Sequence, residues 1–193
     1  AASAKLYTAY AAAFAESNSE QALILSEKAR DYAVKAMALR HETFARLYDK
    51  TAVEFEPVPP SLGPGDEDDL LMVLNAWAVY LLNRKGDWDV VAELPKIQSL
   101  AERLVELDEG FQHGSGHLVL GVIKTILPAA LGGKPEEAKT HFERAIELSE
   151  GASLQAKVYY ASRYARLMFD RELHDRLLNE VLETPADIVP ELT

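Results

Sequence analysis

The stretch of sequence that decides the fold is Gly133-Lys134-Pro135-Glu136-Glu137-Ala138-Lys139-Thr140-His141-Phe142-Glu143-Arg144-Ala145-Ile146-Glu147-Leu148. It predicts a helix over residues 134–148. Ala138 and Ala145 are small enough to let neighbouring helices approach closely, and the Phe142 ring between them is large enough to fill the gap that remains. The stretch therefore predicts a helix that packs against other helices.

Part of this stretch recurs earlier in the chain. Residues 102–110 (ERLVELDEG) match residues 143–151 (ERAIELSEG) at an offset of 41 residues, and a weaker third copy lies at 36–44. Similarity at a fixed period is typical of a solenoid of helical pairs. The small–Phe–Ala spacing resembles the second helix of a tetratricopeptide (TPR) repeat, although the offset exceeds the roughly 34 residues of that repeat.

Helical patterns and short connections extend along the whole chain. Short connections imply antiparallel neighbours, so we expect an all-α fold of about eight helices, arranged as TPR-like stacked antiparallel hairpins (an α/α solenoid). The expected helices are 3–16, 19–39 with a continuation at 43–53, 66–84, from the Gly86-Asp87 turn to 107 with a break or kink at Pro95, 115–131 capped by Ser115 and bent at Pro128, 134–148, 153–169 and 171–182.

We expect these helices to form a single domain over residues 1–193. The chain has 193 residues and a mass of 21.4 kDa, which is enough to bury a core without disulfides or metals. Residues 56–65 contain four Pro and two Gly and are expected to be a stiff, extended loop inside this domain.

Composition excludes several classes of function. The formal net charge is −11, which disfavours nucleic acids and anionic membranes as partners because phosphate binding needs Lys and Arg. The chain has no Cys, so disulfides, iron–sulfur clusters and thiol catalysis are excluded. The longest apolar run, residues 70–82, is too short to span a bilayer.

The sequence contains no pattern typical of catalysis. It lacks a nucleophile elbow, a phosphate-binding loop and a dinucleotide fingerprint. His113 and His117 flank a glycine turn with no further metal ligand beside them, and the acidic run 66–69 is typical of a helix start rather than of a calcium loop. We therefore expect no enzyme activity, no metal and no cofactor.

Two apolar helices provide candidate binding residues. Residues 70–82 are apolar on every face except at Asn75, and Lys124 is the lone charge in the helix that begins at 115. Such helices lie in the centre of a stack, line an apolar pocket with a few polar groups inside, or form an interface. Lys124 has the alternative of extending its amine to the rim. On the pocket interpretation Asn75, Trp77, Tyr80 and Lys124 are candidates.

The helix expected over 153–169 provides three more candidates. Tyr160, Arg163 and Tyr164 share one face by their i, i+3 and i+4 spacing, while Val158, Ala161, Ala165 and Met168 suit the packed side. An aromatic face that also carries Arg suits a partner peptide or a carboxylate. The alternative interpretation is a solvated face with Tyr filling gaps.

A set of longer strings points to one family. The strings are Gly86-Asp87-Trp88, Ala92-Glu93-Leu94-Pro95, His117-Leu118-Val119-Leu120-Gly121, Leu127-Pro128-Ala129-Ala130-Leu131-Gly132-Gly133, Lys157-Val158-Tyr159-Tyr160-Ala161 and Asp170-Arg171-Glu172-Leu173-His174. Together they resemble the T component of TPR-associated TRAP transporters, from about residue 76 to residue 193. Residues 127–133 and 170–182 are more specific than a generic TPR consensus.

The resemblance implies a function. Members of the family are all-α accessory proteins with TPR-like hairpins, exported to the periplasm and often lipoproteins, and they act with the solute-binding protein of a TRAP system that imports organic acids. It therefore implies a periplasmic scaffold that binds this solute-binding protein, with a lipid anchor on a segment before residue 1 and a further helix after residue 193. Whether the protein also binds a small hydrophobic or anionic ligand, and whether it forms a homo-oligomer, are left open at this point.

The alternative function is a stand-alone ligand carrier or storage protein. Its apolar pocket would lie between the helices expected at 66–84 and 115–131. The resemblance carries no functional residues over to this chain.

Overall fold

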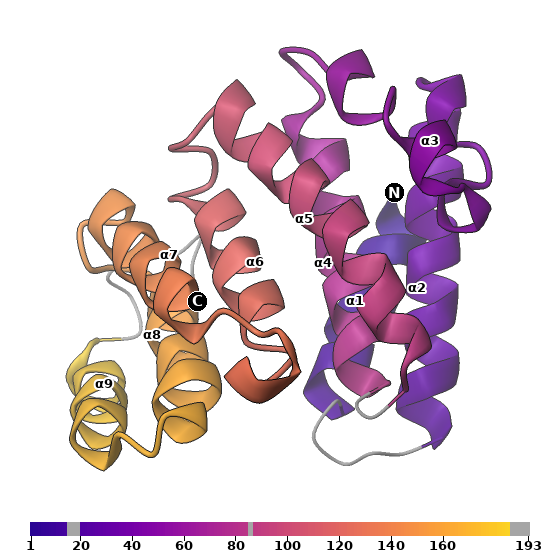
Figure 1. The fold of residues 1–193 in the computed structure, drawn as a ribbon. Coiled ribbons are helices and arrows are strands. Elements are labelled where there is room, and N and C mark those ends of the chain that lie inside the picture. The colour runs from indigo at the N-terminus through magenta and orange to yellow at the C-terminus, as the bar shows by residue number, and fades with distance from the viewer. Residues whose placement is uncertain (15–19, 85–86, 186–193) are drawn as a thin grey trace. The chain divides into compact units, whose positions relative to one another are not determined.

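The computed structural model describes residues 1–14, 20–84 and 87–185, and within these ranges it contains helices and turns but no β-strand (Figure 1). The all-α prediction is confirmed; the TPR-like solenoid stays a prediction. The described helices are α1 (Ala2–Phe14), α2 (Glu20–Ala38), α3 (Ala52–Phe55), α4 (Glu67–Asn83), α5 (Asp89–Leu107), α6 (Ser115–Lys124), α7 (Pro135–Leu148), α8 (Leu154–Tyr159) and α9 (Arg171–Glu183). Short 3₁₀ turns occupy Glu42–Phe44, Leu47–Asp49, Pro59–Ser61 and Ala129–Leu131, and a π-helical segment occupies Tyr160–Ala165.

Several helix predictions are confirmed where local end signals are strong. The acidic run before residue 70 begins α4, Pro135 is at the start of α7, and the Asp170 carboxylate caps α9 by accepting the Leu173 N–H at 3.0 Å. Pro95 lies inside α5, which continues through it without the break that was one of the two expectations, and the kink stays a prediction. The predicted end of the first helix at Glu16, the start of the second at Ser19 and the Gly86 turn position lie outside the described residues.

The helix predicted over 115–131 is wrong in length. It ends at Lys124, whose carbonyl instead accepts the N–H of Lys134 at 3.0 Å, so the chain folds back on itself. Pro128 disfavours helical geometry at the residue before it, which ends the helix early rather than bending it. Ser115 is not the cap: Gly114 precedes the helix, and the Ser115 hydroxyl donates to the Phe111 carbonyl.

Two other predictions are wrong in the first half of the chain. Residues 43–53 do not continue the second helix, and form two 3₁₀ turns before the short helix α3, which Thr51 caps. Residues 56–65 are not extended throughout, because Pro59–Ser61 form a 3₁₀ turn. Proline is compatible with the start of a helical turn, where its missing N–H costs nothing.

The chain folds into two compact units, unit 1 at Ala1–Asp108 and unit 2 at Glu109–Thr193. In unit 1, α4 packs against α1, α2 and α5, and its side chains are buried from Leu70 to Asn83 except at Asn75. In unit 2, consecutive helices from α6 to α9 pack against one another. The single domain expected from the sequence stays a prediction. No described helix is long and apolar enough to cross a membrane.

The decisive stretch lies in the core of unit 2. Phe142 is fully buried, and so are Ala138 and Ala145 on either side of it. Gly121 of α6 faces the Phe142 ring: a Cβ added there would lie 2.8–2.9 Å from three ring carbons. The contact between α6 and α7 therefore depends on the absence of a side chain at residue 121.

Replacing Gly121 by Ala is expected to lower the free energy of unfolding by about 1–3 kcal/mol, because the new methyl group would overlap the Phe142 ring, itself stacked on Tyr160. Urea unfolding followed by circular dichroism measures this. In a Phe142→Leu background the same Gly121→Ala change should cost less, since the ring is gone. If Gly121→Ala leaves the free energy of unfolding unchanged in the protein that keeps Phe142, the result contradicts this packing.

Candidate functional site

A buried polar cluster connects four elements of unit 1. The Arg30 guanidinium of α2 lies between the rings of Tyr48 and Tyr80, 3.9 and 3.6 Å from their centroids. Its Nη1 pairs with Glu93 of α5 at 2.9 Å, and the Trp77 Nε1–H of α4 donates to the same carboxylate. Burial raises the pKa of Tyr48 well above its usual value. Paired charges and aromatic faces together make burial of Arg30 tolerable.

This cluster determines where the candidates of unit 1 lie. Trp77 is fully buried and Tyr80 nearly so, and both contact the Arg30–Glu93 pair, whereas Asn75 is exposed. The sequence analysis did not identify Arg30, Tyr48 or Glu93 as members of such a cluster. One feature of Arg30 could have indicated that it faces the core. It lies one helical turn from Ser26 and one turn from Val34, and both of these residues are buried. The side chains of Trp77 and Tyr80 thus serve the packing of unit 1.

In unit 2, Lys124 is buried and paired. Its Nζ lies 2.6 Å from Glu137 Oε2, and its side chain is 4% exposed. The hydrogen bond from Lys124, followed by that from Lys134, lowers the pKa of Glu137 to about 2. The Lys124 ammonium group is therefore paired. It neither extends by itself to the rim of a pocket nor lies unpaired inside an apolar pocket.

The side of α8 and the π-helical segment that packs inward agrees with the prediction only in part. Tyr160 and Tyr164 are buried, and the Tyr160 ring stacks on Phe142 with centroids 5.4 Å apart. Val158 and Met168, expected to be packed, are 39% and 40% exposed. Ala161 and Ala165, also expected on the packed side, are fully buried. The buried side therefore includes Tyr160 and Tyr164 together with these alanines, and the wider π-helical turn shifts the angular position of residues after its start, such as Met168.

Further interactions hold Tyr160 and distinguish Arg163. The Tyr160 hydroxyl donates to Glu143 at 3.0 Å, and burial, followed by this carboxylate, raises the pKa of Tyr160. Arg163 is partly exposed, and its Nε is buried without a hydrogen-bond partner among the described residues.

The seven predicted residues fall into both units, three in unit 1 and four in unit 2. Their binding role stays a prediction.

Two histidines meet where α6 packs on α7. His117 Nδ1 lies 2.9 Å from His141 Nδ1, and His117 Nε2 lies 3.1 Å from Glu109 Oε1. Arg144 also contacts Glu109, at 2.9 Å. Burial, followed by the positive charges of His117 and Lys124, lowers the pKa of His141 to about 4. Among described residues, no group of three or more His, Asp or Glu side chains is placed to hold a metal ion.

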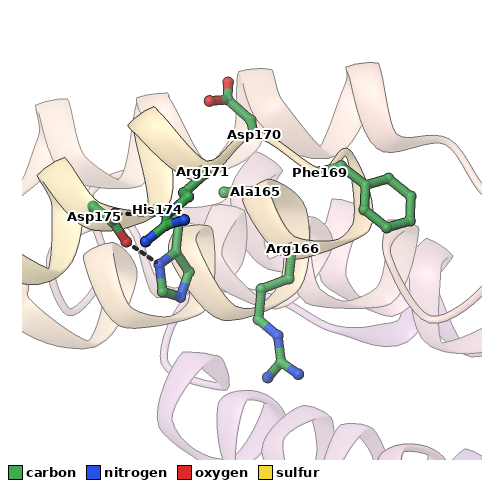
Figure 2. Close-up of a pocket in the computed structure, with 7 residues that line it drawn as sticks. All are labelled: Ala165, Arg166, Phe169, Asp170, Arg171, His174 and Asp175. Atoms are coloured by element: carbon green, nitrogen blue, oxygen red, sulfur yellow. Dashed lines mark hydrogen bonds and ion pairs between the residues drawn. The ribbon is translucent and has the colours of Figure 1, made fainter.

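A surface hollow lies where the π-helical segment ends and α9 begins (Figure 2). Its volume is about 530 Å³. Figure 2 shows Asp175 beside both Arg171 and His174, while Arg166 and Phe169 extend away from that group. The residues that line the hollow are Ala165, Arg166, Phe169, Asp170, Arg171, His174 and Asp175.

Phe169 forms the turn at this hollow in an unusual conformation. Its φ is +57°, and its side chain is 93% exposed. The N–H of Asp170 donates to the Ala165 carbonyl at 2.8 Å and the N–H of Phe169 to the Arg166 carbonyl at 3.3 Å, which is the Schellman pattern of a helix end. Glycine normally occupies this left-handed position, and another residue there costs about 1–2 kcal/mol.

The charges around the hollow are unevenly paired. The hydrogen bond from His174, followed by that from Arg171, lowers the pKa of Asp175. Arg166 is exposed and forms no ion pair with any described residue. An exposed aromatic ring beside an unpaired guanidinium has the composition of residues that dominate protein–protein contacts. We therefore take this hollow as the candidate functional site.

Comparison with known proteins identifies one family. The family model described as TRAP transporter T-component matches residues 1–193, the whole chain. A search of curated proteins finds no match.

The His117–His141 pair makes stability depend on pH. His141 has an ordinary pKa of 6.5 and a pKa of about 4 in the fold, so unfolded chains bind a proton that folded chains do not. The stabilisation is present above pH 6.5 and is lost as the pH falls from 6.5 to 4. The free energy of unfolding should fall by about 1–3 kcal/mol more over this range in the unchanged protein than in His141→Asn.

Urea titrations at pH 7.5, 6, 5 and 4 measure this difference. The stabilisation from Glu109 and Glu137 is lost as the pH falls from 4.5 to about 2, so it begins to fall at the lowest pH of the series, and does so in both proteins. Parallel pH curves for His141→Asn and the unchanged protein would contradict the role of His141.

Proposed function

We propose that this chain, which belongs to the TRAP transporter T-component family, is a periplasmic scaffold that binds the solute-binding protein of its transport system. The family assigns an accessory role in TRAP transport, and the match over all 193 residues is the observation that carries the proposal. The partner, the compartment and any bound ligand are parts of the proposal. A lipid anchor before residue 1 belongs to it as well.

The surface of unit 2 supports docking as the mechanism. Phe169 and Met168 expose apolar surface at the end of one helix, and Arg166 beside them has no carboxylate partner among the described residues. The charged groups that titrate abnormally, such as Glu109 and Glu137, are held in ion pairs. These features favour a partner-binding role over an enzymatic one.

The proposal predicts saturable binding in a calorimetric titration of the chain with the purified solute-binding protein of the same system. Titrations with and without solute would show whether solute loading controls docking. Absence of binding under both conditions would contradict the proposal. The alternative, a ligand carrier, would then be tested by native mass spectrometry for a retained hydrophobic or anionic molecule.

Arg163 provides a charge-reversal variant for the same titration. Its side chain is partly exposed with an Nε that no described residue bonds, so Arg163→Glu should weaken binding while the circular dichroism spectrum stays unchanged. A matched control is Arg46→Glu, because Arg46 is an exposed residue in unit 1. Equal affinity of Arg163→Glu and the unchanged protein would remove Arg163 from the contact.

A further inference from the structure

Two helices of unit 2 end in the same hydrogen-bond pattern with a residue other than glycine in the left-handed position. At the end of α7, the N–H of Gly151 donates to Ile146 at 2.8 Å, and Glu150 has a φ of +51°. At the hollow, the N–H of Asp170 donates to Ala165 at 2.8 Å, and Phe169 has a φ of +57°. Both positions favour glycine for the same steric reason.

The two residues differ in what they expose. Glu150 is a charged side chain that water solvates well, whereas Phe169 exposes 93% of an aromatic side chain. Phe169 therefore combines backbone strain with exposed apolar area, and neither favours folding of the described chain. Strain and exposed apolar surface at one residue indicate a role outside the fold.

The charge beside Phe169 indicates the chemistry of the partner. The chain carries a net charge of −11, yet Arg166 is exposed and has no ion pair among the described residues. Arg171 on the same hollow is 91% exposed at its side chain and reaches Asp175 only at 3.4 Å. A partner surface with carboxylates around an apolar pocket would complement both the guanidinium groups and the ring.

We propose that Phe169 and Arg166 form the docking anchor for the solute-binding protein. The Phe169 ring enters an apolar pocket on that protein, and Arg166 pairs with a carboxylate at the rim of the pocket. The inference rests on the function proposed above and adds the face and the chemistry of the contact. A second copy of this chain is the competing occupant, which repulsion between two chains of net charge −11 disfavours.

The test compares Phe169→Gly with Glu150→Gly. Both changes relieve a left-handed residue in the same helix-end pattern, so each should raise the melting temperature by about 2 °C. Only Phe169→Gly removes the ring, and it should raise the calorimetric Kd for the solute-binding protein at least about tenfold. Glu150→Gly should leave the Kd within about twofold. A substitution that stabilises the fold yet weakens binding separates docking from structure.

Arg166 is tested through the salt dependence of binding. Arg166→Glu should raise the Kd, and Arg166→Gln should make the Kd less sensitive to NaCl than it is in the unchanged protein. Sedimentation velocity of each variant alone reports any change in self-association.

The outcomes separate this inference from the proposed function. If the unchanged protein does not bind the solute-binding protein, the proposed function fails. If the unchanged protein binds and Phe169→Gly binds equally well, only the anchor is overturned. If Phe169→Gly abolishes self-association and leaves the Kd unchanged, the patch joins two copies of this chain, and the anchor is again overturned.

Discussion

The π-helical segment Tyr160–Ala165 is the constraint on which the exposed surface of unit 2 depends. Within it Tyr160, Ala161, Tyr164 and Ala165 are buried, and the Tyr160 ring stacks on Phe142. Val158 and Met168, on either side of the segment, are partly exposed. The same segment leads directly into the helix end at Phe169. A single irregularity in one helix thus connects the core around the decisive Phe142 to the surface hollow, which agrees with the frequent occurrence of π-helical turns at functional sites.

Sequence alone was sufficient wherever a helix has a strong local signal at its start or end. The acidic first turn of α4 is such a signal, and the structure adds Pro135 at the start of α7 and the Asp170 cap of α9. It failed where the helix end depends on distant partners. The predicted 115–131 helix ends at Lys124, ahead of Pro128, and the chain then folds back so that the Lys124 carbonyl accepts the Lys134 N–H, a contact that periodicity does not reveal. The π-helical segment has no recognised sequence signal either.

The candidate residues show the same division between local and long-range information. The large side chains on the apolar helices were selected as binding candidates, but the residues that they contact lie far along the sequence. Trp77 and Tyr80 contact Arg30 and Glu93, and Lys124 pairs with Glu137. Phe169 could not be identified as the exposed end of a helix, because glycine normally gives that signal and is absent there.

The account joins a family role in TRAP transport to one small surface at the start of α9. Hydrogen–deuterium exchange of the full chain, with and without its solute-binding protein, tests this claim most directly. The account predicts slower exchange of backbone amides at 165–175 in the complex and no change at 20–55. Protection confined to residues 20–55, with unchanged exchange around Phe169, would contradict it.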